Sequence, residues 1–148
     1  MRLELVRDWM SREVITIRPE KSADEARQLM DEEAIRRLPV VGENGRLIGI
    51  ITLSDLRQEP PPTLTINDLM RLNPITISEN VTVGEAAETM LTHKISGLPV
   101  LNAQSQLVGI ITESDIFRLV VHDWRKHQGD SPQPYTRYNQ DPQGPKGF

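Results

Sequence analysis

Residues 49–55 read GIITLSD, and residues 109–115 read GIITESD. The likeness extends outward from this stretch: residues 6–57 align on residues 66–117 without a gap, at a constant offset of 60 and with 19 identities in 52 positions. Repeats of this length usually form stacked structural units that share a core. The sequence therefore predicts two similar units, and the repeated polar residues become the candidates for function.

Each repeat is predicted to begin with a short apolar element and a brief strand. The apolar elements lie at residues 6–10 and 66–70, and β-branched residues at 14–17 and 74–77 indicate the strands. Helices should follow, because Ser22 with Glu25 and Thr82 with Glu85 fit the capping box. In the second helix one apolar stripe should face the core, with the following members: Val83, Ala86, Ala87, Met90 and Leu91.

The second half of each repeat is predicted to be a hairpin followed by a helix. Residues 38–41 and 46–51 read as strands, and the Asn44-Gly45 pair between them suits a tight turn because both residues tolerate positive φ. Thr52 and Thr112 should each open a second helix, the latter running towards Lys126. The predicted fold class is α+β, with two β-α-β-β-α repeats related by a pseudo-twofold axis.

Composition divides the chain and excludes several classes of function. We expect a first repeat at 1–59, a proline-rich linker at 60–65, a second repeat at 66–127 and a flexible tail at 128–148, where Gly, Pro, Gln and Asn are frequent. With 17 Lys and Arg against 21 Asp and Glu, the net charge of −4 does not favour nucleic acid as a partner.

The 148 residues contain no cysteine, no signal-like start and no apolar run near the ~20 residues that span a bilayer. A cytoplasmic protein without a membrane partner is therefore expected. His93, His122 and His127 lack the spacing of metal ligands and are predicted to be solvated.

The repeated stretch Gly-h-h-Thr-x-Ser-Asp, where h is apolar, lies where a strand passes into a helix. The first amides of a helix are unpaired and attract anions such as phosphate, and the hydroxyl of Thr52 or Thr112 would add a donor. The carboxylates of Asp55 and Asp115 would accept hydrogen bonds from neutral hydroxyls such as those of ribose. These groups together suit the sugar and phosphate of a nucleotide.

A structural role is the alternative for these residues. Thr-x-x-Asp is itself a variant of the capping box, and it would be present if its only task were to start a helix. Taken alone, the motif favours this structural interpretation.

The residues resemble the cystathionine β-synthase (CBS) domain, which occurs in tandem pairs called Bateman modules. The resemblance covers roughly residues 3–121 and rests on three motifs, each present twice: Asp-x-Met, Ile-x-x-Leu-Pro-Val and Gly-h-h-Thr-x-x-Asp. It implies two clefts between the repeats that bind adenosine-containing ligands such as AMP, ADP, ATP, S-adenosylmethionine or NAD. We expect no required cofactor and no catalytic residue.

The family pattern implies which residues line each cleft, because Thr-x-x-Asp of one repeat joins adenine-facing residues of the other. One pocket would combine the following residues: Thr112, Ser114, Asp115, Met10, Ile15, Ile35, Arg36 and Arg37. The second pocket would combine these: Thr52, Ser54, Asp55, Met70, Ile75, Ile95 and Ser96. Small residues often precede Leu-Pro-Val, as Ser96 does here, so Arg36 and Arg37 would either obstruct adenine or grip a phosphate.

The leading hypothesis is a stand-alone sensory module that binds an adenosyl compound and signals to an effector protein. A homodimer is expected, because two small repeats leave more helix surface than one core can cover. The alternative is a structural or protein-interaction module with vestigial clefts. A small nucleotide hydrolase is a third hypothesis, but we find no nucleophile with an evident base.

Overall fold

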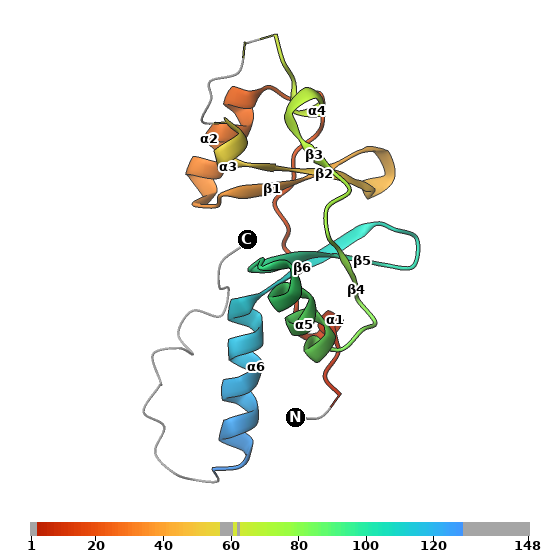
Figure 1. Cartoon of the computed structure of the whole chain (residues 1–148), viewed down its shortest axis with the longest axis vertical. Helices are drawn as coiled ribbons and strands as arrows, with labels where there is room; N and C mark the ends of the chain where they lie inside the picture. Colours follow the sequence, from red (N-terminus) through yellow and green to blue (C-terminus); the bar gives the residue numbers. More distant parts are fainter. Residues whose placement is uncertain (1–2, 57–60, 62, 129–148) are drawn as a thin grey trace.

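The computed structural model describes residues 3–56, 61 and 63–128, and these form two stacked units (Figure 1). Each unit contains a three-stranded sheet, in the order β1-β2-β3 and β4-β5-β6. In chain order the elements are α1 (Val6–Trp9), α2 (Ala23–Glu33), β1 (Arg37–Val41), the 3-10 helix η1 (Glu43–Gly45), β2 (Leu47–Thr52), α3 (Leu53–Leu56), α4 (Ile66–Leu69), β3 (Arg71–Leu72), β4 (Ile77–Ser78), α5 (Val83–His93), β5 (Gly97–Leu101), β6 (Leu107–Thr112) and α6 (Glu113–Lys126). The α+β prediction is confirmed.

Capping boxes start α2 and α5, as predicted. At α2 the Glu25 amide donates to Ser22 Oγ at 3.1 Å, and the Ser22 amide donates to a Glu25 carboxylate oxygen at 2.8 Å. At α5 the Glu85 amide donates to Thr82 Oγ1 at 3.1 Å, and the Thr82 amide donates to a Glu85 carboxylate oxygen at 2.9 Å. Two amides that the helix would leave unpaired are thereby satisfied at each start.

The hairpins form at the expected places, with β1 antiparallel to β2 and β5 antiparallel to β6. Asn44 and Gly45 take positive φ values of 61° and 72°, which is the property that made the pair a turn signal. The second hairpin turns with a positive φ of 61° at Ser105 instead. Serine carries a Cβ and tolerates this region less well, so the sequence signal was weaker there.

The first strand of each repeat is shorter than predicted. In the second repeat only Ile77 and Ser78 form a strand, β4, which lies parallel to β5. In the first repeat Ile17 makes a single parallel bridge to Val40, so the predicted strand at 14–17 is reduced to one residue. The Ile17 amide donates to the Pro39 carbonyl and the Ile17 carbonyl accepts from the Val41 amide, both at 3.0 Å. Residues with high β propensity thus approach a sheet edge without extending it.

The repeats exchange their first helices. Val6 of α1 and the following Met10 belong to the core under the β4-β5-β6 sheet, and the Val6 amide donates to the Val81 carbonyl at 2.9 Å. Conversely, Ile66 of α4 belongs to the core of the β1-β2-β3 sheet, and its amide donates to the Lys21 carbonyl at 2.9 Å. Each unit is therefore completed by chain from the other repeat, which the sequence did not predict.

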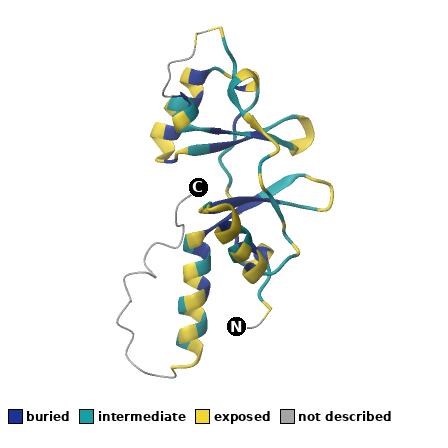
Figure 2. Ribbon diagram, viewed as in Figure 1, coloured by how far each residue is buried: buried dark blue, intermediate teal, exposed yellow. Residues whose placement is uncertain are grey.

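Two apolar clusters form the cores, and Figure 2 shows buried residues along the strands of both sheets. Met30 and Met90 are buried, as a core role predicts. The predicted stripe on α5 is too wide, because Leu91 is 81% exposed while Val83, Ala86 and Met90 are buried. Leu91 falls at the edge of the stripe, where the sheet no longer covers the helix.

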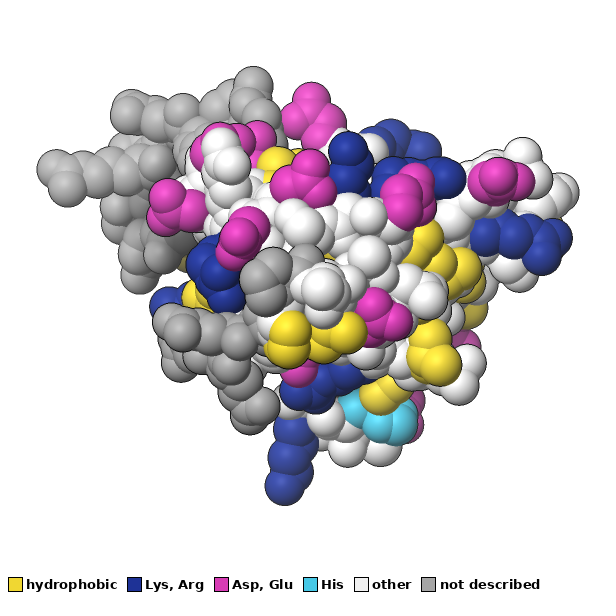
Figure 3. All heavy atoms as spheres, turned by 90° about the horizontal axis from the view of Figure 1, so that it is seen from above, with side chains coloured by type: hydrophobic (Ala, Val, Ile, Leu, Met, Phe, Trp, Pro, Cys, Tyr) yellow, Lys and Arg dark blue, Asp and Glu magenta, His cyan; other side chains and the backbone are white. Residues whose placement is uncertain are grey.

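The remaining expectations concern the ends of the repeats. α6 ends at Lys126, as predicted. Residues 60 and 62 of the proline-rich linker, and residues 129–148 of the predicted tail, lie outside the described residues. Viewed from above, acidic and basic side chains are interspersed over the described part of this face (Figure 3), which therefore offers no continuous basic surface.

Candidate functional site

Thr52 and Asp55 lie at the junction where β2 passes into α3. The Thr52 amide donates to Asp55 Oδ2 at 3.0 Å, and the Asp55 amide donates to Thr52 Oγ1 at 3.2 Å. This is the capping arrangement that the structural alternative predicts. It occupies one carboxylate oxygen, Oδ2, and leaves the other oxygen directed away from the helix start.

Thr112 and Asp115 form the equivalent junction between β6 and α6, but deeper in the molecule. The amide and hydroxyl of Thr112 both donate to Asp115 Oδ2, at 2.8 and 3.2 Å. Asp115 is only 6% exposed and Thr112 9%. The same motif is therefore buried in the second repeat and half-buried in the first.

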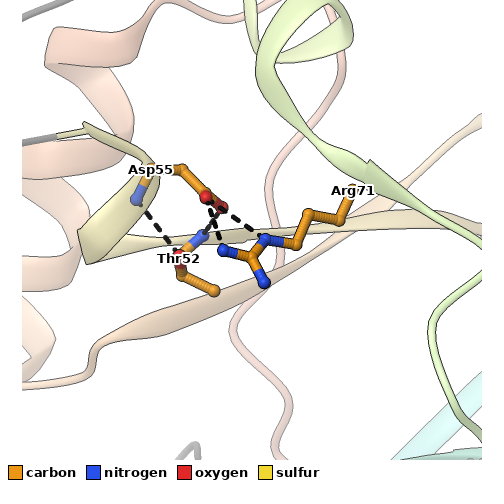
Figure 4. A network of polar contacts seen from close by, with 3 residues as sticks. All are labelled: Thr52, Asp55 and Arg71. Carbon is orange, nitrogen blue, oxygen red and sulfur yellow. Dashed lines mark hydrogen bonds and ion pairs between the residues drawn. The ribbon is translucent and has the colours of Figure 1, made fainter. Parts of the chain in front are cut away.

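Arginines pair with the second oxygen of both aspartates. Arg71, from β3, donates to Asp55 Oδ1 through Nε at 3.2 Å and Nη2 at 3.0 Å (Figure 4). Arg118 lies one turn along α6 and donates to Asp115 Oδ1 through Nη1 at 2.8 Å. The partner of Asp55 thus comes from the other repeat, whereas that of Asp115 comes from the same helix.

The two carboxyl groups have opposite pKa shifts. Burial raises the pKa of Asp55, but hydrogen bonds from Thr52 and Arg71 outweigh it and leave the pKa below its usual value. Burial of Asp115 is more severe and raises its pKa, despite the opposing hydrogen bonds from Thr112 and the charge of Arg118. The fold therefore favours the charged form of Asp55 and disfavours that of Asp115.

Gly49 and Gly109 allow the exchanged chain segments to approach the central strands. A Cβ on Gly49 would lie 2.7 Å from Met70 Sδ and 2.8 Å from the Arg71 carbonyl oxygen. A Cβ on Gly109 would lie 2.5 Å from Met10 Sδ and 2.8 Å from the Ser11 carbonyl oxygen. At both glycines the absence of a side chain therefore lets backbone and methionine of the other repeat lie against the strand.

Met10 and Met70 are thereby brought beside the strands that end in Thr112 and Thr52, as the predicted pockets require. Ile15 packs against the first core and Ile95 against the second, and both are half-buried. Ile35 is buried in the first core. Ile75 is 38% exposed.

The segments before Leu-Pro-Val contact the junction of their own repeat. The Leu53 amide donates to the Arg36 carbonyl at 2.8 Å, and Arg37 stands opposite Thr52 in the β1–β2 ladder. Similarly, the Glu113 amide donates to the Ser96 carbonyl at 3.0 Å. The grouping of Arg36 and Arg37 with Asp115, and of Ser96 with Asp55, stays a prediction. Ser54 is exposed and Ser114 half-buried.

A hollow of about 730 Å³ lies beside α2 and α3 in the first unit. Ile35, Arg36 and Leu53 line it, together with residues of α2. The predicted site residues Ile35 and Arg36 thus face open volume on this side.

Sequence reasoning missed Arg71 and Arg118. The available signal was the departure from the repeat: position 71 is Arg where position 11 is Ser, and position 118 is Arg where position 58 is Gln. Both arginines sit at positions where the duplication is not kept, close to residues that it keeps.

Within the described residues, no three side chains of His, Asp or Glu gather as metal ligands would. The same part of the chain contains no helix long and apolar enough to cross a bilayer. The three histidines, all exposed, lie on or beside α5 and α6.

Two stacked units with a repeated Thr-x-x-Asp junction define the class of protein. A sequence profile of the CBS domain matches twice, at residues 6–61 and 66–122. The chain belongs to the CBS domain family and contains a tandem pair of these domains.

Relatives show where such pairs occur. Inosine-5'-monophosphate dehydrogenase of Korarchaeum cryptofilum is 40% identical over 109 residues, which is 74% of this chain but only 23% of that enzyme. The CBS domain pair of protein MJ0100, solved with 5'-methylthioadenosine and S-adenosyl-L-methionine, is 36% identical with a TM-score of 0.70 and covers 82% of this chain and 98% of its own. CBSX2 of Arabidopsis thaliana, solved with AMP, is 25% identical with a TM-score of 0.74 and covers 82% and 99%.

Proposed function

We propose that this CBS pair is a regulatory module that binds adenosine-containing ligands beside its two Thr-x-x-Asp junctions. Ligand occupancy would be passed to an effector protein through altered packing of the two units. The proposal includes AMP, ADP, ATP, S-adenosylmethionine and NAD as candidate ligands, and it requires no catalytic residue.

The observation that carries the proposal is that the two oxygens of each aspartate have different hydrogen-bond partners. In both junctions Oδ2 is held by the Thr amide, at 3.0 Å for Asp55 and 2.8 Å for Asp115. Among the described residues, the hydrogen bonds to Oδ1 come from an arginine side chain, which is 67% exposed for Arg71 and 43% exposed for Arg118. A ligand hydroxyl can therefore take Oδ1 without breaking the helix start, because the arginine can move into water.

Two solved relatives support the choice of ligand class. The similar CBS pair of protein MJ0100 was crystallised with two adenosyl compounds, and CBSX2 with AMP. Adenosine is the part that these three ligands share. A site that accepts hydrogen bonds from ribose through a fixed carboxylate suits that shared part.

The two clefts are proposed to differ in affinity. Ser96 and Gly97 leave room for a flat ring beside Ile95, whereas Arg36 and Arg37 either fill the equivalent space or reach a phosphate. If they obstruct adenine, replacing both by Ser and Gly should raise the affinity of the cleft that they line. If they bind phosphate, the same replacement should weaken the binding of ATP more than that of AMP, and the binding of AMP more than that of adenosine. Calorimetry measures these affinities.

A homodimer is proposed on the basis of uncovered apolar helix surface. Leu91 on α5 is 81% exposed, and on α6 Phe117 is 64%, Val120 45% and Trp124 38% exposed. The three residues of α6 are spaced i, i+3 and i+7, so they share one face of the helix. A twofold partner presenting the same face would bury them.

The same surface favours the second candidate function, an interaction module whose clefts are vestigial. The two functions differ in whether adenosyl compounds bind. Absorbance of an adenine chromophore in the purified, ligand-unsupplemented protein would favour the sensor.

A thermal-shift series tests the proposal, with adenosine, AMP, ADP, ATP, S-adenosylmethionine and NAD as ligands and GMP as the control. A ligand at 100 times its Kd adds about 2.7 kcal/mol to the free energy of unfolding. We expect a shift with at least one adenosyl compound, none with GMP, and loss of the shift when Asp55 and Asp115 are both replaced by Asn. Absence of a selective shift would contradict the proposal.

A further inference from the structure

The pair formed by Arg71 and Asp55 joins the two repeats at a predicted binding position. Arg71 belongs to β3, a strand of the second repeat that pairs with β2 of the first sheet. In this pairing Arg71 lies opposite Ile50. Its guanidinium directs two hydrogen bonds, at 3.2 and 3.0 Å, to a single oxygen, Asp55 Oδ1 (Figure 4). The Asp55 side chain is 16% exposed and that of Arg71 is 67% exposed.

This geometry leaves a ligand hydroxyl no vacant acceptor position on Asp55 Oδ1. A carboxylate oxygen has about two acceptor positions, and Arg71 fills both positions of Oδ1. The Thr52 amide holds Oδ2 at 3.0 Å as part of the helix start. A ribose hydroxyl can therefore bind to Oδ1 only if the guanidinium moves away.

We propose that Arg71 is a specificity-determining residue, which makes the Asp55 site select adenosyl ligands that carry a phosphate. A phosphate attached to the ribose gives the displaced guanidinium a new anionic partner as the hydroxyls take its place on Asp55. Adenosine and 5'-methylthioadenosine offer no such partner and release Arg71 to water. This inference rests on the proposed function and adds the ligand class at one of its two sites.

The duplicated repeat supplies an internal comparison. Position 11 corresponds to Arg71, and Ser11 exchanges backbone hydrogen bonds with Ile110 at 2.8 and 2.9 Å, so its backbone lies beside β6 as that of Arg71 lies beside β2. The serine side chain is too short to reach the Asp115 carboxylate in the way that Arg71 reaches Asp55. Asp115 Oδ1 instead accepts one bond, from Arg118 of its own helix at 2.8 Å.

The two sites should therefore differ in how they treat phosphate. Arg118 leaves one acceptor position on Asp115 Oδ1 for a hydroxyl, so the second site is not closed by a residue from the opposite repeat. The dependence on phosphate that Arg71 introduces belongs to the Asp55 site alone.

The test is calorimetric titration of the full chain with AMP and with adenosine, in an Asp115→Asn background that weakens the second site. Arg71→Ser installs the residue of position 11, and Arg71→Lys keeps the charge without the fork. Arg46→Ser removes the same charge from the exposed turn between β1 and β2 and is the matched control. Thermal unfolding checks that each variant is folded.

We expect Arg71→Ser to reduce the ratio of AMP affinity to adenosine affinity by on the order of tenfold, with adenosine binding as well as before or more tightly. Arg71→Lys should keep part of the preference, and Arg46→Ser all of it. If Arg71 had a purely structural role, its replacement would lower the affinity for both ligands together. An unchanged ratio, or an equal loss for both ligands, would overturn the inference alone. Binding of neither ligand to the wild-type chain would overturn the proposed function and the inference with it.

Discussion

Replacing Asp55 and Asp115 by Asn, one at a time, should change the stability of the ligand-free protein differently at neutral pH. The two residues occupy equivalent positions of the repeat, but the pKa of Asp55 is lowered and that of Asp115 is raised. Asparagine keeps an oxygen that can accept the Thr amide, so the helix start survives in both variants. The comparison therefore isolates the charge.

The expected magnitudes follow from exposure. Asp55→Asn removes an ion pair whose arginine is 67% exposed, and solvent screening limits its contribution to about 0.5 kcal/mol. That loss corresponds to a fall in Tm of roughly 2 °C for a chain of this size. Asp115→Asn removes a charge that burial disfavours and leaves Arg118, 43% exposed, free to be hydrated. Its Tm should stay unchanged or rise.

The pH dependence fixes the signs. The pKa of folded Asp55 is below its unfolded value, so the stability that the wild type has over Asp55→Asn should vanish as the pH falls through the lowered pKa. The pKa of folded Asp115 is above its unfolded value. The wild type should therefore gain stability relative to Asp115→Asn as the pH falls through that raised pKa.

Thermal unfolding from pH 7 down to the acid range measures these differences, with Asp31→Asn, an exposed position on α2, as the control for losing one carboxylate. The reasoning is refuted if Asp115→Asn lowers Tm at pH 7 by more than Asp55→Asn does. It is also refuted if the two variants follow the same pH curve.

Two further predictions concern packing. Gly49→Ala places a Cβ 2.7 Å from Met70 Sδ and 2.8 Å from a backbone oxygen, so it should lower the free energy of unfolding by about 1–3 kcal/mol in urea titrations. The control is Gly84→Ala, which lies in a helix with its nearest contact at 3.7 Å and should be neutral or stabilising. Similar losses of stability at both glycines would contradict the account. Replacing Phe117 and Val120 by Ser should convert a dimer to a monomer in light scattering at micromolar concentration, and a wild-type chain that is already monomeric would contradict the proposed homodimer.

Much of the fold could be predicted because the local signals agree with one another. Ser22 and Glu25 form the capping box that their spacing indicates, and Asn44 takes the positive φ of the expected turn. These features depend on residues only a few positions apart. They can therefore be predicted from the sequence almost completely.

The features that were not predicted depend on long-range packing. α1 and α4 each pack against the sheet of the other repeat. Residues 6–10 show that α1 has an apolar side, but they do not specify which of the two sheets covers it. Leu91 fits the stripe of α5 and yet is exposed, because its position is uncovered in the folded unit. Arg71 reaches Asp55 only because β3 lies next to β2.

The candidate site was predictable as far as the repeat conserves it within the chain. Thr52 and Asp55 were found because they recur as Thr112 and Asp115, and both pairs lie at strand-to-helix junctions as expected. The difference between the junctions was not predictable in the same way. It arises from burial and from arginines at positions where the two repeats differ.

The central claim is that the Asp oxygen not used by the helix start receives a ligand ribose. A crystal structure of the protein with AMP tests it most directly. The account predicts AMP in a cleft between the repeats, with a ribose hydroxyl donating to Oδ1 of Asp55 or Asp115 and the Thr amide still bonded to Oδ2. AMP bound elsewhere, or AMP present at saturating concentration with no ribose hydroxyl bonded to Oδ1 of either aspartate, would contradict it.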